Sequence, residues 1–227
     1  MPRFVLFDID GTLIDSGHAG FMALTHAFQH LTGITNGFAG IGFAGKTDLR
    51  IIKDALEKHS IQINSGWLER FLDIYLLHLR TAMAKGTGHV NPGVRPLLET
   101  LAADEDFYLG LLTGNTEDGA RTKLDPFTLN SYFPVGAYGN DSEDRNALLP
   151  LAVQRLAEHS SVSVDYSDCV VIGDTPLDVV CADYHGARSI AVATGSYDLD
   201  ALRDTHADMV LPDLSDTNKI FNWLKSW

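Results

Sequence analysis

An apolar run near the N-terminus ends abruptly in two carboxylates, and this junction constrains the fold more than any other stretch. Residues 4–7 are all apolar, with β-branched and aromatic members, and Asp8, Asp10 and Gly11 follow them. Such a run is typical of a strand that is covered on both faces in a parallel sheet. Side chains at i and i+2 of an extended chain share a face, so both carboxylates are expected to point to one place at the carboxyl end of the strand.

Two carboxylates on one face repel each other unless a cation lies between them or one of them is protonated. The pair Asp8 and Asp10 therefore indicates a metal site or acid–base chemistry. The alternative is a strand that ends in an ordinary Asp/Gly turn at Gly11. We favour the chemical interpretation because this edge of an open α/β sheet is where ligands bind.

Residues 16–87 carry the signals of a small all-helical unit. The predicted helices cover residues 16–31, 47–56 and 64–85, with Gly33 as the stop of the first. A glycine-rich loop precedes the second helix, which Thr47 or Asp48 can cap. We predict that residues 16–87, called the helical unit below, form a domain inserted between two segments of an α/β core, 1–15 and 88–227.

Beyond Pro92, short apolar runs alternate with helical spacing. Strands are predicted over residues 107–112, 135–138, 168–172, 189–193 and 209–211, and helices over residues 94–101, 120–124, 148–156 and 177–184. This alternation indicates βαβ units around a parallel sheet. The predicted fold class is therefore α/β, a doubly wound, Rossmann-like parallel sheet with a small all-helical domain inserted after its first strand.

Polar residues follow several of the predicted strands. They are Thr113 and Asn115, then Arg145, then Asp174 and Asp178. Because strand ends converge in this architecture, these groups are expected to meet Asp8 and Asp10. Each group alone has a simpler explanation: a helix cap for Asn115, acids in the first turn of a helix for the later aspartates, and a solvated charge for Arg145.

In order and spacing, these residues resemble the motifs of the haloacid dehalogenase superfamily, in the phosphatase branch with a helical cap inserted after the first motif. The matching segments are Asp8-Ile9-Asp10-Gly11-Thr12 for the DxDGT motif, Thr113 for the second motif, and Gly173-Asp174 through Asp178 for the fourth. The third motif usually has a lysine, and here the chain departs from the pattern. Arg145 is the best substitute, because its guanidinium can neutralise phosphate and carboxylate. Lys123 is the alternative, although it lies one motif too early.

The resemblance implies a role for each matched residue. Asp8 is the expected nucleophile, which forms an aspartyl-phosphate, and Asp10 is the expected general acid and then general base. The expected ligands of Mg²⁺ are Asp8, the backbone carbonyl of Asp10, and Asp174. Asp178 would support the metal or orient Arg145. The residues expected to bind the phosphoryl group are Thr113, Arg145, Gly11, Thr12, Gly114 and Asn115.

Two basic residues of the helical unit, Lys46 and Arg50, are expected to face the leaving group. They could meet a carboxylate, a sugar hydroxyl or a second phosphate. A solvated charge at the start of a helix is the alternative for both.

The leading functional prediction is a Mg²⁺-dependent phosphomonoester hydrolase acting on a small phosphorylated metabolite. Asp10 argues against a dehalogenase, whose class lacks the second acid, and against a phosphonate hydrolase. A phosphomutase of the β-phosphoglucomutase type keeps both acids but passes the phosphoryl group to a sugar. A receiver-like signalling module phosphorylated on Asp8 would need neither the helical insertion nor Asp10, and a catalytically silent binding protein is a third alternative.

Composition narrows the class of protein further. The net charge of −13 disfavours non-specific nucleic-acid binding. No stretch of 18 or more apolar residues predicts a membrane span, and the predicted first strand begins too early to follow a signal sequence, so we expect a cytoplasmic protein. Cys169 and Cys181 are the only cysteines, and we expect both to be buried thiols rather than a disulfide.

Overall fold

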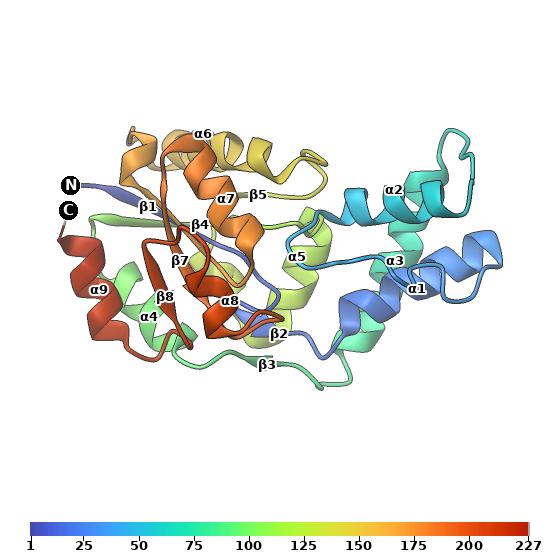
Figure 1. Ribbon diagram of the computed structural model, residues 1–227, viewed down its shortest axis with the longest axis horizontal. Helices are drawn as coiled ribbons and strands as arrows, with labels where there is room; N and C mark the ends of the chain where they lie inside the picture. Colours follow the sequence, from blue (N-terminus) through green and yellow to red (C-terminus); the bar gives the residue numbers. More distant parts are fainter. Residues whose placement is uncertain (227) are drawn as a thin grey trace.

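The main sheet consists of six parallel strands in the order β5-β4-β1-β6-β7-β8 (Figure 1). The computed structural model describes residues 1–226 of the chain. The strands are β1 (Arg3–Phe7), β4 (Phe107–Leu112), β5 (Gly136–Ala137), β6 (Cys169–Gly173), β7 (Arg188–Val192) and β8 (Met209–Leu211). The central position of β1 explains its apolar sequence, because both of its edges are paired and both of its faces are buried.

Helices cover both faces of this sheet. Alternate residues of β1 point to opposite sides, so that Val5 and Phe7 pack in one hydrophobic cluster and Phe4 and Leu6 in another. The first cluster includes α4 (Val94–Ala102), α5 (Glu117–Leu124) and α9 (Thr217–Lys225), and the second includes α6 (Leu148–Ser160) and α7 (Pro176–His185). The predicted doubly wound α/β fold is confirmed.

The remaining helical elements of the core are short. They are α8 (Leu199–Arg203) and the 3-10 turns η1 (Asp125–Phe127), η2 (Asn130–Tyr132), η3 (Arg145–Ala147) and η4 (Tyr166–Asp168). Cys169 and Cys181 are buried free thiols, as expected. Among the described residues, no helix is both long and apolar enough to cross a membrane.

The helical unit contains α1 (Ala19–Thr32), α2 (Asp48–Lys58) and α3 (Trp67–Met83). Its buried side chains form a hydrophobic cluster of their own, in which Phe28, Phe71 and Tyr75 are fully buried. Figure 1 shows these helices at the end of the molecule opposite to the two termini. Two short antiparallel strands, β2 (Ile14–Asp15) and β3 (His89–Val90), pair the chain entering the unit with the chain leaving it. The boundaries at residues 16 and 87 stay a prediction.

Two helices of the unit begin later than the sequence predicts. Gly17 and His18 adopt left-handed conformations, with φ of 59° and 64°, so α1 begins only at Ala19. Gly66, with φ of 82°, delays the start of α3 to Trp67 in the same way. A left-handed residue cannot continue a right-handed helix, and apolar spacing alone does not reveal it.

Candidate active site

A cavity of about 400 Å³ lies between the carboxyl ends of the strands and the helical unit. Nine of the predicted site residues line it: Asp8, Asp10, Gly11, Lys46, Thr113, Gly114, Asn115, Arg145 and Asp174. The predicted residues outside its lining are Thr12, Arg50 and Asp178. The sheet edge therefore gathers side chains that lie more than 160 positions apart in the sequence.

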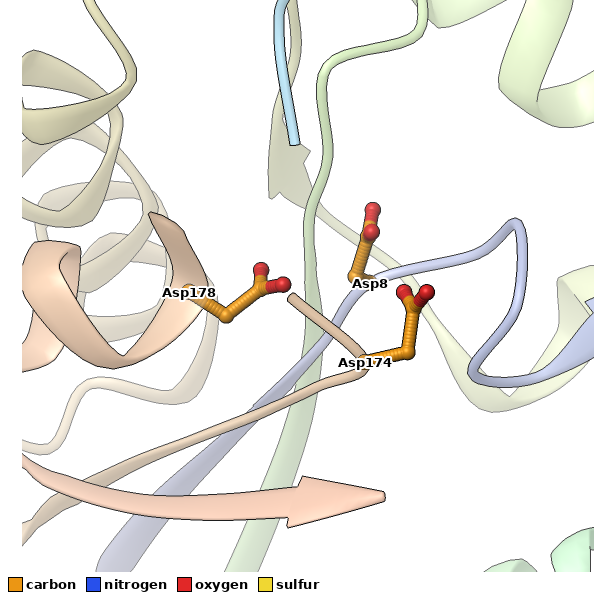
Figure 2. A group of neighbouring side chains, drawn as sticks. All are labelled: Asp8, Asp174 and Asp178. Atoms are coloured by element: carbon orange, nitrogen blue, oxygen red, sulfur yellow. The ribbon is translucent and has the colours of Figure 1, made fainter. Parts of the chain in front are cut away.

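Three carboxylates converge beside the cavity (Figure 2). Asp8 follows β1, Asp174 follows β6, and Asp178 lies in the first turn of α7. One oxygen from each lies within 4.8 Å of the others, and all three residues are buried. Asp178 also accepts hydrogen bonds from the amide and hydroxyl of Thr175, at 3.0 and 2.7 Å, and thereby caps α7. Asp178 therefore both caps the start of α7 and belongs to the cluster of carboxylates.

The charge of this cluster is only partly balanced by nearby cations. Burial, Asp178 and Asp8 raise the pKa of Asp174 to about 8, although Arg145 opposes the shift. Burial raises the pKa of Asp8 to about 6, against the attraction of Arg145. Both shifts mean that ionising these groups together is costly here. Buried carboxylate oxygens with surplus negative charge are a donor set suited to a hard divalent cation such as Mg²⁺.

Arg145 reaches the same cluster from the turn that precedes α6. The side chain of Asp144 accepts a hydrogen bond from the amide of Asn146 and fixes the start of η3. The Arg145 guanidinium pairs with Asp178, and its Nη2 lies 3.5 Å from Asp8 Oδ2. Nη1 also donates to the carbonyl of Gly45 at 3.2 Å. The solvated-charge explanation for Arg145 is wrong, because the residue is buried and paired.

Asp10 has entirely different partners. Lys123 Nζ lies 2.6 Å from Asp10 Oδ2, and the side-chain Nδ2 of Asn115 donates to the same oxygen at 2.9 Å. The Ser16 hydroxyl donates to Asp10 Oδ1 at 2.9 Å. Burial acts to raise the pKa of Asp10, but Lys123, Asn115 and Ser16 lower it overall. The two carboxylates of the first motif therefore lie in one cavity with opposite shifts in pKa.

Lys123, the alternative to Arg145 for the third motif, also lines the cavity, so the structure brings both cations to the same site. Its side chain is buried, and Nζ also donates to Asn115 Oδ1 at 2.6 Å. The sequence contained one signal for this role, because Lys123 shares the buried face of α5 with Ala120 and Leu124. A lysine on an apolar helix face needs a buried partner.

Thr113 and Asn115 occupy the turn after β4. Thr113 is fully buried, its side chain acts to lower the pKa of Asp8, and the side-chain amide nitrogen of Asn115 donates to Thr113 Oγ1 at 3.0 Å. The helix-cap explanation for Asn115 is wrong, because Thr116 caps α5 by accepting from the amide of Gly119.

The remaining predicted residues have mainly supporting contacts. The Thr12 hydroxyl donates to Asp174 Oδ1 at 3.3 Å. Lys46 and Arg50 both pair with Asp54, at 2.7 and 2.8 Å. Lys46 also lines the cavity, whereas Arg50 does not.

Comparisons with known proteins agree with this geometry. A family model described as haloacid dehalogenase-like hydrolase matches residues 5–192. The chain is 24% identical to a phosphoglycolate phosphatase from Yersinia pestis over 219 residues, which cover 94% of this chain and 90% of that protein. Among solved structures, a hydrolase from Pseudomonas syringae superposes with a TM-score of 0.71 at 23% identity, covering 98% of this chain and 99% of that one. A β-phosphoglucomutase from Clostridium difficile gives 0.75 at 15% identity, covering 99% and 97%.

Proposed function

The chain belongs to the haloacid dehalogenase-like hydrolase family, and we propose that it is a Mg²⁺-dependent phosphomonoester hydrolase acting on a small phosphorylated metabolite through an aspartyl-phosphate on Asp8. The family and the phosphoglycolate phosphatase relatives support a phosphatase. One observation carries the mechanism: Asp8 and Asp10 face one cavity, but Asp8 contacts Arg145 and Asp10 contacts Lys123. Two acids in unlike environments suit two different tasks.

In the first half of the reaction, a carboxylate oxygen of Asp8 forms a bond to phosphorus while the ester bond from phosphorus to the leaving oxygen breaks. Asp10 donates a proton to that oxygen and releases an alcohol. Approach of the anionic phosphoryl group favours the protonated form of Asp10 that this step requires. Arg145, Thr113 and the amides around Gly114 bind the phosphoryl oxygens and balance their charge.

In the second half, water attacks phosphorus and the bond between phosphorus and the Asp8 oxygen breaks. Asp10, now a carboxylate, accepts the proton of that water. Lys123, Asn115 and Ser16 hold Asp10 by hydrogen bonds, which keeps the base in position between the two steps. Phosphate leaves and the Asp8 carboxylate is regenerated.

The residues that would hold Mg²⁺ are Asp8 and Asp174, with Asp178 supporting them. When bound, Mg²⁺ supplies positive charge that lets a carboxylate nucleophile approach an anionic phosphoryl group. The raised pKa values of Asp8 and Asp174 support this assignment, since burial and, to a smaller extent, neighbouring carboxylates make the ionised forms costly without a bound cation.

The proposal is tested with p-nitrophenyl phosphate, assayed with MgCl₂ and with EDTA. We expect hydrolysis that requires the metal, and Asp8→Asn is expected to lower kcat by at least about 10⁴-fold because it removes the nucleophile. Asp73→Asn, on the exposed face of α3, is the matched control and is expected to behave as the wild type.

Full activity of Asp8→Asn, or metal-independent turnover, would contradict the mechanism. Release of inorganic phosphate separates a hydrolase from a mutase, since a mutase passes the phosphoryl group to a second hydroxyl. Trapping of [³²P]phosphate on the wild type but not on Asp8→Asn would identify the nucleophile directly.

A further inference from the structure

The wall of the cavity contributed by the helical unit is largely apolar. Phe21, Leu24, Phe43 and Ile51 line it. Phe21 lies in the first turn of α1, yet 48% of its surface is exposed. An exposed phenylalanine that faces a catalytic cavity has apolar surface available for a ligand.

Phe21 is the outer end of a row of aromatic rings. Its ring meets Phe43 edge-to-face at 5.3 Å, Phe43 meets Phe38 at 5.6 Å, and Phe38 meets Phe28 at 5.1 Å. Phe28 and Phe38 are buried in the hydrophobic cluster of the helical unit. This row anchors Phe43, and through it Phe21, so the two rings form a preorganised surface.

The aromatic surface lies on the leaving-group side of the site. Gly20, which precedes Phe21, is so close to Lys123 that a Cβ at this position would lie 2.8 Å from its Nζ. Lys123 in turn binds Asp10, the proposed donor of the proton to the leaving oxygen. The part of a substrate that extends beyond that oxygen therefore reaches the first turn of α1.

The lysines and arginines of the described cavity lining all have acidic partners. Lys46 pairs with Asp54, which Arg50 shares, Lys123 pairs with Asp10, and Arg145 pairs with Asp8. Asp15 and Asp48 add further negative charge. A carboxylate on the leaving group would therefore compete with Asp54 for Lys46 and would lie in a cavity that already holds several acids.

We propose that Phe21 and Phe43 form a subsite for an apolar, planar group in the alcohol part of the substrate, and that Phe21 determines specificity. This inference rests on the proposed hydrolysis of phosphomonoesters. It separates this chain from an enzyme for phosphoglycolate, whose alcohol part is small and carries a carboxylate.

The test compares three esters of primary alcohols, 2-phenylethyl phosphate, ethyl phosphate and phosphoglycolate, so that the chemistry at phosphorus is matched. For the wild type with MgCl₂, we expect kcat/KM for the phenylethyl ester to exceed that for each other ester by about tenfold or more. Phe21→Ala is expected to reduce the ratio of phenylethyl to ethyl ester about tenfold, mainly through KM. Met22→Ala, on the same helix and outside the cavity lining, should keep the wild-type ratio.

Binding provides a readout that does not depend on turnover. Calorimetry with 2-phenylethylphosphonate and ethylphosphonate should give a tighter Kd for the former, and Phe21→Ala should remove the difference. Equal binding of the two phosphonates, or an unchanged ratio in Phe21→Ala, overturns the subsite. Preference for phosphoglycolate that Lys46→Ala abolishes also overturns it. Absence of hydrolysis of all three esters, with the binding difference intact, contradicts the proposed function and leaves the subsite supported.

Discussion

Arg145 and Lys123 each pair with a carboxylate at the sheet edge, but the two pairs differ in burial. Arg145 lies between Asp8 and Asp178, and all three side chains are less than 10% exposed. Lys123 is as deeply buried, whereas the side chain of Asp10 is 38% exposed to the cavity. Removing Arg145 therefore leaves the buried carboxylates of Asp8 and Asp178 without this partner, whereas removing Lys123 leaves the partly hydrated carboxylate of Asp10.

We predict that Arg145→Ala lowers the free energy of unfolding by about 3–5 kcal/mol and that Lys123→Met lowers it by about 1 kcal/mol. Activity toward p-nitrophenyl phosphate should fall by about 100-fold or more in Arg145→Ala, because this variant lacks the proposed contact with the phosphoryl group. Urea unfolding without metal and steady-state kinetics measure the two effects. Equal destabilisation by both variants would show that the exposure of Asp10 does not matter.

Asp48 provides a prediction about pH. Burial raises its pKa to about 6, although Lys123 and a hydrogen bond from the Thr116 amide at 3.0 Å oppose the shift. The folded protein therefore binds this proton more tightly than the unfolded chain does. Asp48 should contribute a loss of stability, roughly 1–3 kcal/mol, as the pH rises from about 4 to about 6.

Asp48→Asn cannot ionise but keeps an oxygen for the Thr116 amide. Across that pH window, its free energy of unfolding should rise relative to the wild type, measured by urea unfolding at a series of pH values. Asp54→Asn is the opposite control, because hydrogen bonding from Lys46 lowers the pKa of Asp54. Its free energy of unfolding should fall relative to the wild type as the pH rises. Parallel curves for Asp48→Asn and the wild type would be inconsistent with the raised pKa.

At the scale of elements, glycines in two loops and at the end of β6 allow close packing around the acidic cluster. A Cβ on Gly195, after β7, would lie 1.7 Å from Asp174 Oδ2, and one on Gly11 would lie 2.5 Å from the same atom. A Cβ on Gly173 would lie 2.0 Å from Asp178 Cγ. Gly11 also has φ of 80°, which favours glycine for a second reason.

Gly195 tests this close packing without backbone strain, because its φ lies outside the left-handed region. Gly195→Ala should displace the Asp174 carboxylate and weaken Mg²⁺ binding by at least about tenfold. The rise in Tm on addition of MgCl₂ measures the effect, and Gly42→Ala is the control because nothing lies within 4 Å of a Cβ there. An unchanged Mg²⁺ dependence in Gly195→Ala would contradict the proposed role of Asp174 in binding Mg²⁺.

The sequence predicted the elements better than the contacts between them. Apolar periodicity located β4 and β8 to the residue, since it records which face of each element is buried. It did not identify β2 and β3, because two residues contain no period. The pair of Lys123 and Asp10 joins residues 113 positions apart and depends on how α5 packs beside the end of β1, so local patterns could not assign it.

Motif order succeeded where periodicity could not. Arg145 follows β5, a two-residue strand with almost no signal of its own, yet its place in the sequence of motifs located it beside Asp8. Lys46 and Arg50, which the sequence predicts to face the leaving group, both pair with Asp54, and of the two only Lys46 lines the cavity. Ion pairs of this kind compete with ligand binding; the spacing of Arg50 and Asp54, four residues apart, indicates their pair in the sequence, whereas Lys46 lies before α2 and its pair depends on the fold.

At the scale of the whole molecule, the helical unit and the α/β core have separate hydrophobic cores, and residues of both line one cavity. The helical unit has its own cluster, and the sheet has clusters on both faces. The two connecting segments are held together by β2 and β3, in which Ile14 pairs with Val90 and Asp15 with His89. Antiparallel strands of this type can be closed by a two-residue Asn-Gly turn.

We therefore predict that a chain in which Asn-Gly replaces residues 16–88 folds as an independent α/β core. It should unfold cooperatively, with an m-value reduced in proportion to its smaller buried surface, and MgCl₂ should still raise its Tm because Asp8, Asp174 and Asp178 all remain. Hydrolysis should fall strongly, since the open site admits water and loses Ser16 and the aromatic wall.

A matched deletion that also removes Ile14 and Asp15 lacks the paired strands and should be less stable. Helix α3 of the helical unit also packs against α5 of the core. A core without a cooperative transition would mean that these two helices belong to one folding unit, and the predicted boundaries at residues 16 and 87 would then be wrong.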